Sequence, residues 1–443
     1  MNTDRSLFRV SVRALLAGER VGFISPTGFL AMHLFQGTAW ILLILFAFRQ
    51  GAVGSLLFFA MVHAFGLGFL TLAALSVLVH VLPAAADLPV GKSLRDLGPN
   101  GGVILGALLF VGGWILPDLR VSLAGGVVVL FSGGYFLARV IREIAAGWGR
   151  ARPRGIGLDL MAAMALTFFV VGALLGILML ATLLHPAFGI SLTLAPPAHA
   201  LMMIGGWLAL LVMSVFLRTS GPLLGRSIMS EHSVKGWILV LSGILLALPG
   251  LLMPIPVLIF PAYALGVAGL FLYGRPLGRA IFGSHPINPY PILFLRSSLA
   301  WLIVGGFLLF ASLGLFPLPL AGILMVFLVG VVGQFFLAHL YHLGPRLLSI
   351  LRNGPGDLTP PVALLDKRRS LGTFLLYQAA IVLVILSFLL EGRSFEWLGL
   401  AGACLGFLAW VSLSMEARSA WIITGRLQKT EDQILFPVTR KKP

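Results

Sequence analysis

The stretch SLLFFAMVHAFGLGFLTLAALSVLVHVLP, residues 55–83, contains no aspartate, glutamate, lysine or arginine. A helix that crosses a bilayer needs about 20 predominantly apolar residues, and this stretch is longer than that. Proline ends it at position 83, because proline cannot donate the backbone hydrogen bond of a helix interior. The stretch therefore predicts a membrane-spanning helix, and it places two histidines, His63 and His80, in that helix.

The composition of the whole chain agrees with this first helix. Of the 443 residues, 59% are hydrophobic and 10% are charged, and the mean hydropathy is +1.02. A soluble domain has about 25% charged residues, so the solvent of this chain is the lipid bilayer. The net charge of +16 does not indicate nucleic acid as a partner, because no basic stretch is interleaved with aromatic residues that could stack on bases.

Other apolar stretches of this kind occur along the whole chain. Together they predict an all-α, polytopic membrane bundle of about twelve transmembrane helices. An amphipathic segment at 1–23 precedes the membrane domain at 24–415, and a basic tail at 416–443 follows it. The third span is short, and little more than Met253-Pro254 separates the seventh from the eighth. The predicted spans are 24–48, 53–82, 101–116, 120–143, 158–184, 197–218, 235–253, 255–274, 292–316, 318–344, 371–391 and 395–415.

The basic residues predict how the chain is oriented. With the N-terminus inside, the loops on the outer side hold only Arg49, Arg120 and Arg393 of the 31 lysines and arginines. Basic residues accumulate in cytoplasmic loops, where they face anionic headgroups. The sequence therefore predicts a multi-pass protein of a bacterial-type inner membrane, with both termini in the cytoplasm.

Three spans that run in the same direction resemble one another. Spans 2, 6 and 10 end in His80–Pro83, Arg218–Pro222 and His342–Pro345, and spans 2 and 6 begin with the related segments that contain His63 and His199. These spans are four apart in order. A repeat at that spacing predicts three four-helix units about a pseudo-threefold axis. The alternative is that proline simply ends helices in many places.

Twelve spans, histidines on spans 2, 6 and 10 and a threefold plan resemble the haem–copper oxidase subunit I superfamily. The resemblance is closer to its non-catalytic relatives, including the haem–copper membrane proteins of nitric-oxide response. In that family a span-2 histidine ligates low-spin haem, and His63 is the matching position. A span-6 histidine ligates copper, and His199 matches by span and side. The resemblance thus implies haem b and copper as cofactors, electron transfer, and respiratory-chain membrane subunits as partners.

The sequence also departs from the oxidases of this superfamily. They carry a tyrosine four residues after the span-6 histidine, and this chain has Met203 there. They carry a histidine pair around span 7, and the predicted span 235–253 has no histidine. Their span-10 histidines lie toward the outside, whereas His339 and His342 lie at the predicted inner end. These departures predict that the chain has no oxygen-reducing centre of its own.

The depth of each histidine limits which ones can share a cofactor. With a rise of about 1.5 Å per residue, His33 and His63 both lie near the midplane on consecutive helices, where two neutral imidazoles could ligate haem iron or copper. His80, His339 and His342 lie together at the inner ends of spans 2 and 10, which predicts a bis-histidine haem b near the cytoplasmic face. The alternatives are hydrogen bonds to helix carbonyls and anchoring at the headgroups.

Other features restrict the function without deciding it. The predicted spans contain almost no carboxylates, since Asp159 opens one span and Glu391 and Glu396 lie at outer ends. Proton-coupled proteins usually need buried acids, so no carboxylate relay is expected. Cys404 is the one cysteine, which excludes a disulfide within the chain and a thiolate zinc site. A cofactor-free transporter and a structural subunit remain alternatives to the redox protein, and the sequence leaves open whether the chain is an enzyme.

Overall fold

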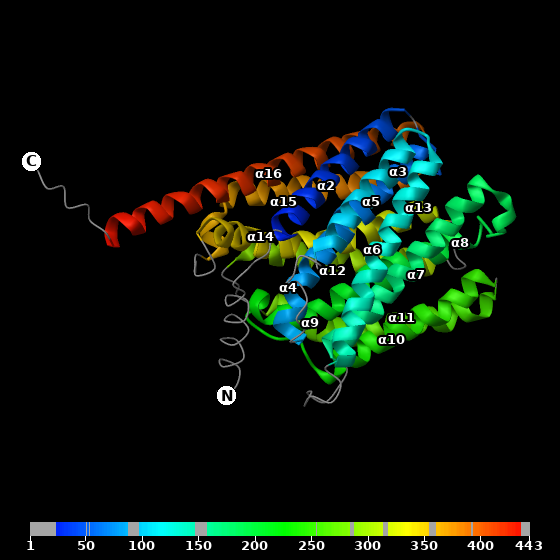
Figure 1. The fold of residues 1–443 in the computed structure, drawn as a ribbon, viewed down its shortest axis with the longest axis horizontal. Coiled ribbons are helices and arrows are strands. Elements are labelled where there is room, and N and C mark those ends of the chain that lie inside the picture. The colour runs from blue at the N-terminus through cyan, green and yellow to red at the C-terminus, as the bar shows by residue number, and fades with distance from the viewer. Residues whose placement is uncertain are drawn as a thin grey trace, which may run out of the picture.

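The computed structural model describes residues 24–49, 51–52, 54–86, 97–146, 157–253, 255–283, 288–312, 318–353, 360–390 and 393–435. These residues form helices joined by short turns, and none of them is in a strand. Figure 1 shows the helices lying side by side in one bundle. The predicted all-α class is confirmed.

Eleven helices in the described residues are long and apolar enough to cross a membrane, and a twelfth apolar segment, Asn100–Ile115, is shorter. This matches the twelve predicted spans, including the short third one, so the chain is a multi-pass membrane protein. The helices are α2 (Ile24–Phe48), α3 (Leu56–His63), α4 (Leu72–Ala86), α5 (Leu97–Ile115), α6 (Leu119–Ala146), α7 (Leu158–Leu184), α8 (Ala195–Ala200), α9 (Leu210–Leu224), α10 (Glu231–Leu252), α11 (Ile259–Phe282), α12 (Pro289–Ser312), α13 (Leu320–Met325), α14 (Gln334–Asn353), α15 (Lys367–Leu389) and α16 (Arg393–Leu435).

Three spans contain a π-helical segment, a form that is rare and often marks functional sites. η1 (Ala64–Thr71) joins α3 to α4, η4 (Leu201–Ala209) joins α8 to α9, and η6 (Val326–Gly333) joins α13 to α14. These are spans 2, 6 and 10, the ones that the sequence singles out as a repeat. They are also the most enclosed spans. In the most apolar part of each, 78%, 61% and 72% of the residues are buried, against 50% or less in the other long spans. The three π-helical spans therefore line the centre of the bundle.

The same close contact recurs at each π-helical segment. A Cβ atom on Gly68 would lie 2.4 Å from the Phe35 ring, and one on Gly206 would lie 2.4 Å from the Phe168 ring. A Cβ atom on Gly330 would lie 3.0 Å from the Trp301 ring. In each case the aromatic residue comes from the helix that precedes the π-helical span, namely α2, α7 or α12. Glycine is thus needed at one equivalent position in all three.

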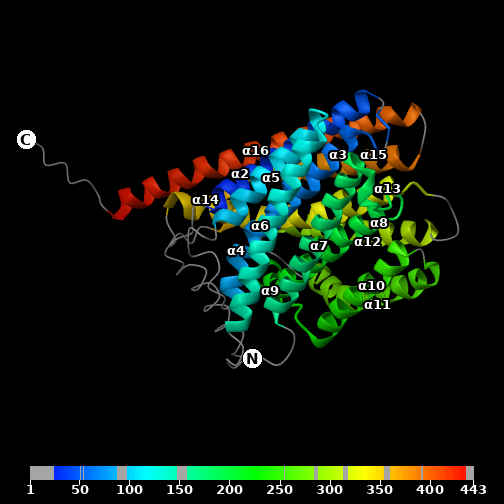
Figure 2. The ribbon, with the colours of Figure 1, turned by 45° about the vertical axis from the view of Figure 1, so that its right-hand side comes forward.

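Aligning the spans on these glycines reproduces the sequence repeat. The residues twelve positions further on are His80, Arg218 and His342, the same three that begin the matching proline-containing segments. The prediction that proline ends each span there is wrong, because α4, α9 and α14 continue through Pro83, Pro222 and Pro345. The last two helices of each unit also pair closely, α5 with α6, α10 with α11 and α15 with α16. Figures 1 and 2 both show α10 beside α11 at an edge of the bundle. The structure therefore has the three four-helix units α2–α6, α7–α11 and α12–α16.

Hydrogen bonds tie the central segments together. Thr71 Oγ1 donates to the carbonyl of Gly66, five residues earlier, at 2.9 Å, and it accepts from Trp207 Nε1 at 3.1 Å. Ser298 Oγ on α12 donates to the Val331 carbonyl of η6 at 2.9 Å. A π-helical turn leaves backbone groups out of the regular ladder, and buried backbone groups need partners. Side-chain hydroxyls supply some of those partners here.

α16 is longer than any predicted span. It runs for 43 residues from Arg393 to Leu435, roughly 64 Å at 1.5 Å per residue, about twice the thickness of a bilayer core. Figure 1 shows it extending beyond the rest of the bundle toward the C-terminus. The sequence places the end of this span at residue 415, and the helix continues without a break through Glu416.

Candidate functional site

The structure brings together two of the predicted ligand residues, His63 and His199. Their ring centroids are 6.3 Å apart, and the ring planes meet at 33°. His63 is the last residue of α3, directly before η1. His199 lies in α8, two residues before the first residue of η4. The pair therefore sits where two of the three π-helical segments begin.

Both imidazoles are oriented by backbone carbonyls. His63 Nδ1 donates to the carbonyl of Phe59 at 2.8 Å, and His199 Nδ1 donates to the carbonyl of Gly172 on α7 at 2.9 Å. Since a carbonyl oxygen only accepts, each Nδ1 carries the proton, and each neutral ring keeps its lone pair on Nε2. A metal-binding histidine typically donates its other ring N–H in this way, which fixes the tautomer and the ring orientation.

Small residues on α7 make room for His199 and for the methionine that follows it. A Cβ atom on Gly176 would lie 2.9 Å from His199 Cε1, and one on Gly172 would lie 2.7 Å from Met203 Sδ. The thioether of Met203 therefore packs against the same glycine whose carbonyl holds His199. Soft thioether and imidazole ligands favour Cu(I). In the part of the chain that the structure describes, no group of three or more histidine, cysteine or acidic side chains forms a metal site.

The predicted pairing of His33 with His63 is not the contact that these side chains make. His33 Nε2 lies 2.6 Å from Ser414 Oγ on α16, and its ring stacks on Trp410 at 5.3 Å. Trp410 Nε1 in turn donates to the His33 carbonyl at 2.8 Å. His33 thus joins α2 to α16, whereas the ring of His63 contacts His199 and, at 4.8 Å, Phe110.

The predicted histidines on span 10 lie near α9. His339 is buried, with Nδ1 3.0 Å from the Phe335 carbonyl and Nε2 3.3 Å from Thr219 Oγ1 on α9. The rings of Phe216 and Phe335 pack on it at 5.7 and 4.7 Å. His342 lies one turn further along α14 and is half-buried. His80 belongs to α4, but its side chain is outside the part of the chain that the structure describes.

A buried carboxylate that the sequence analysis missed lies in the third unit. Glu416 is only 2% exposed, and its carboxylate accepts hydrogen bonds from Tyr341 Oη at 2.9 Å, Ser370 Oγ at 2.7 Å and Thr373 Oγ1 at 2.8 Å. The prediction that membrane spans hold almost no carboxylates did not include Glu416, because the predicted twelfth span ends at residue 415. The apolar run Ala420–Ile423 beyond Glu416 was the signal that the helix continues in the bundle.

Amide side chains form a second polar group in this unit. Ser297 Oγ donates to Gln378 Oε1 at 2.6 Å, and Gln378 Nε2 donates to Gln334 Oε1 at 2.6 Å. Gln334 is fully buried, and its Nε2 has no hydrogen-bond partner in the structure. The position of Gln334 matches Leu72 and Leu210 in the other two units, counted from the shared glycine. This polarity is therefore particular to the third unit.

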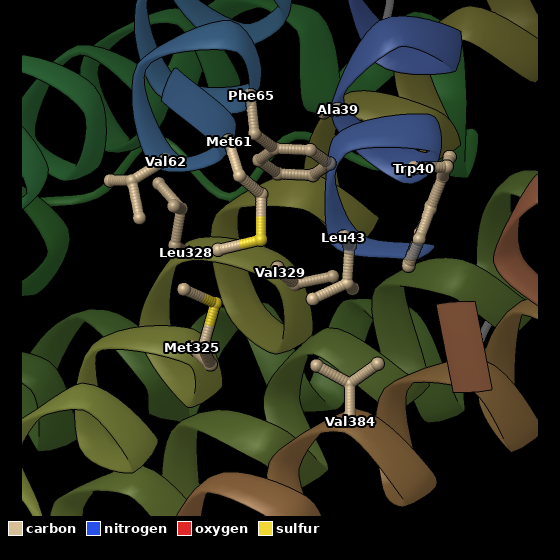
Figure 3. A pocket seen from close by; sticks show the side chains of 10 residues that line it. All are labelled: Ala39, Trp40, Leu43, Met61, Val62, Phe65, Met325, Leu328, Val329 and Val384. Carbon is tan, nitrogen blue, oxygen red and sulfur yellow. The ribbon is translucent and has the colours of Figure 1, made fainter. Parts of the chain in front are cut away.

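An apolar cavity lies between the first and third units, as Figure 3 shows. The sulfur-bearing side chains of Met61 and Met325 line it from α3 and α13 (Figure 3). None of the predicted histidine ligands is among its lining residues. They are Ala39, Trp40, Leu43, Met61, Val62, Phe65, Met325, Leu328, Val329 and Val384.

No protein-family model matches this chain, and a search of curated proteins found no match. The resemblance to the haem–copper oxidase superfamily therefore rests on the histidines and on the plan of twelve spans, and it stays a prediction.

Proposed function

We propose that this multi-pass membrane protein binds a copper ion between His63 and His199, as a divergent relative of haem–copper oxidase subunit I without an oxygen-reducing centre. The observation that carries the proposal is the pair itself. Two half-buried imidazoles from different units lie with their ring centroids 6.3 Å apart, and each has its Nδ1–H committed to a backbone carbonyl. Ionisable residues inside a membrane domain are costly and usually functional.

The separation of the two rings suits a shared metal ion. Copper and zinc bind imidazole nitrogen at about 2.0–2.1 Å, so two rings that bind one ion from opposite sides have centres roughly 6 Å apart. The observed 6.3 Å is close to that value. The Nε2 atoms of His63 and His199 would hold the ion, and Met203, which packs on the same glycine that accepts from His199, is a candidate for a third, sulfur ligand.

The chain's own residues explain why copper is preferred to other metals. The donor set contains no carboxylate and no thiolate, which disfavours calcium, magnesium and structural zinc sites. Imidazole with thioether favours Cu(I). Copper bound there would supply a one-electron redox centre, and the protein would contribute a fixed tautomer at both rings.

Haem fits this pair less well than a bare ion does. The ring of His63 packs against Phe110 on α5, and the ring of His199 packs against Gly176 on α7. A porphyrin around an iron held by these rings would need space that α5 and α7 already take up. We propose haem b only for the other end of the bundle, with His339 or His342 as a ligand. His339 there would have to exchange its 3.3 Å contact with Thr219 for iron.

The threefold plan supports the proposed relationship, because the repeat extends to the π-helical segments and to their glycine contacts. We further propose the orientation that the basic loops predict, with both termini in the cytoplasm of a bacterial-type inner membrane. The partners in that setting would be respiratory-chain membrane subunits, to which a redox-active metal would pass electrons.

Metal analysis of the purified protein tests the proposal. Protein expressed with added copper and washed with a chelator should retain one copper ion per chain, and His63→Ala and His199→Ala should each lose most of it. His33→Ala is the matched control, because His33 bonds to Ser414 and should leave the copper content unchanged. Equal losses in all three variants would contradict the assignment of the site.

The same preparation tests the haem prediction through a reduced-minus-oxidised absorbance spectrum. Sharp b-type bands that disappear in His339→Ala or His342→Ala would support haem at that end. If the protein holds neither copper nor haem, the redox function is wrong. A cofactor-free transporter or a structural membrane subunit would then be the better description.

A further inference from the structure

Glu416 is held by a set of partners that is unusual for a buried carboxylate. The side chains that bond to it are hydroxyls, from Tyr341 on α14 and from Ser370 and Thr373 on α15. Thr373 is also bonded to Ser412 Oγ at 2.7 Å, with either oxygen able to donate. Three helices thus close around one carboxyl group in a membrane span.

Hydroxyl partners suit a carboxyl group that gains and loses a proton. An arginine or a backbone N–H can only donate, so it stabilises the carboxylate and opposes the acid. A hydroxyl group can donate to the carboxylate and can also accept from the protonated acid. The partners of Glu416 can therefore satisfy both forms without moving, which a purely structural ion pair cannot do.

The charged and titratable groups around Glu416 lie on every helix that packs against it. Arg369 on α15 interacts with it electrostatically, but its guanidinium donates to Ser419 Oγ at 2.9 Å and to the Met415 carbonyl at 3.4 Å. Tyr341 donates to it from α14, and Tyr290 on α12 interacts with it electrostatically while its hydroxyl donates to the Lys367 carbonyl at 3.1 Å. α2 presents His33 to α16 one turn away, through Ser414. Arg369 is thus the main positive charge that interacts with the Glu416 carboxylate.

Two buried polar atoms of the third unit have no hydrogen-bond partner in the described part of the protein. Tyr377 lies one turn beyond Thr373 on α15, and its buried hydroxyl has no hydrogen-bond partner in the structure. The hydroxyl is 3.1 Å from where a Cβ atom of Gly333 would lie, and the residue after Gly333 is Gln334, whose Nε2 is also unpartnered. Buried polar atoms without protein partners are usually satisfied by internal water.

We propose that Glu416 is a proton-binding site, at which the carboxylate takes a proton from solution at the α15 N-terminal end and returns it through the surrounding hydroxyls. The site lies close to that end, since Ser370 and Thr373 are three and six residues from Lys367, the first residue of α15. A proton therefore has about 5–9 Å of helix to pass, at 1.5 Å per residue. The proposal does not depend on copper or haem at the histidines.

Infrared spectroscopy of the purified protein, recorded at a series of pH values in H2O and D2O, tests this proposal. The wild-type protein should show a protonated-carboxyl band that disappears as the pH rises and shifts in D2O. Glu416→Gln should lack the band while keeping the shape of the side chain. Glu396→Gln makes the same change near the opposite end of α16 and should keep the band.

A second variant covers the case in which Glu416→Gln does not fold. Thr373→Val removes one hydrogen bond to the carboxyl group at nearly constant shape, so it should change the frequency of the band. The proposal is overturned if no carboxyl band titrates, or if the titrating band is unaffected by both Glu416→Gln and Thr373→Val. Glu416 would then be a permanently ionised or permanently neutral structural group.

Discussion

The first two units of the bundle differ from the third in what they place around the shared glycine. In the first two units, histidine occurs shortly before the glycine, as His63 and His199. The third unit has Met325 in the place of His63, counted from Gly330, and it carries Gln334 four residues after the glycine, where the others have leucine. Its polar groups, among them Glu416, lie along α14–α16. One backbone plan thus supports two kinds of polar site.

This difference separates what the repeat requires from what each unit adds. The glycine contact and the π-helical segment recur in all three units, so they belong to the packing of the bundle. The imidazole pair and the amide and carboxyl groups occur in some units only. Because packing does not require them there, they are the better candidates for function.

The largest effect should come from filling the glycine contact. Gly68→Val and Gly206→Val would push a side chain into the Phe35 and Phe168 rings, 2.4 Å from the new Cβ. Each should destabilise the fold by about 1–3 kcal/mol. Gly330→Val should cost less, because Trp301 is 3.0 Å away. Thermal unfolding in detergent measures the order.

Gly134→Val is the control for these variants. Gly134 lies in α6 and has no atom within 4 Å of an added Cβ, so the substitution should leave the melting temperature nearly unchanged. If Gly330→Val were the most damaging of the four, the equivalence of the three units at this position would be wrong.

Much of this architecture was predictable, because it follows from solvent and spacing. The twelve spans come from the length of apolar runs, and the three units come from span ends such as His342–Pro345. The π-helical segments were not predictable, because a π-helix has no reliable residue pattern and Gly68 alone does not specify one. The contact of Phe35 with Gly68 becomes visible only when the helices are assembled.

The candidate sites were predictable in part. The sequence predicts both His63 and His199 as ligands, but of different cofactors. The depth of a residue along its own helix does not show how far apart two helices lie, so the contact between these rings was not predictable. His33 was paired with His63 by depth alone, and the rotation of α2 turns it to Ser414 instead. Glu416 was missed because the predicted twelfth span ends at residue 415, and the end of a span is the least certain part of its prediction.

Replacing Gln334 with leucine makes the third unit resemble the other two at this position. The change removes the acceptor of Gln378 Nε2 and leaves that half-buried N–H group without its partner, although Ser297 still donates to Gln378 Oε1. The loss should cost about 1 kcal/mol. The double variant Gln334→Leu with Gln378→Leu removes both partners, so it should recover much of that loss. Thermal unfolding of the two single variants and the double variant measures the coupling. A double variant less stable than either single one would show that the amides do not act as a pair.

The smallest effect concerns the caps of two equivalent helices, Ser230 on α10 and Asp366 on α15. Ser230 Oγ accepts from the backbone N–H of Ser233 at 3.2 Å, and Asp366 accepts from that of Arg369 at 2.9 Å. Replacing either residue with alanine should lower the melting temperature slightly at neutral pH, because the first turn loses a partner for its N–H groups. Only the loss at Asp366 should depend on pH.

The sign of that dependence follows from the carboxylate. The Arg369 N–H holds the pKa of Asp366 below its ordinary value, so the stabilisation is present above the pKa of unfolded aspartate, about 3.9, and is lost as the pH falls through the lower folded value. The difference between wild type and Asp366→Ala should therefore shrink in acid, whereas the difference for Ser230→Ala should not. Asp366→Asn keeps an accepting oxygen without a charge, so its stability relative to Asp366→Ala should be constant across the same pH range. A pH-dependent loss at Ser230 would mean that another group, and not the cap of α15, titrates there.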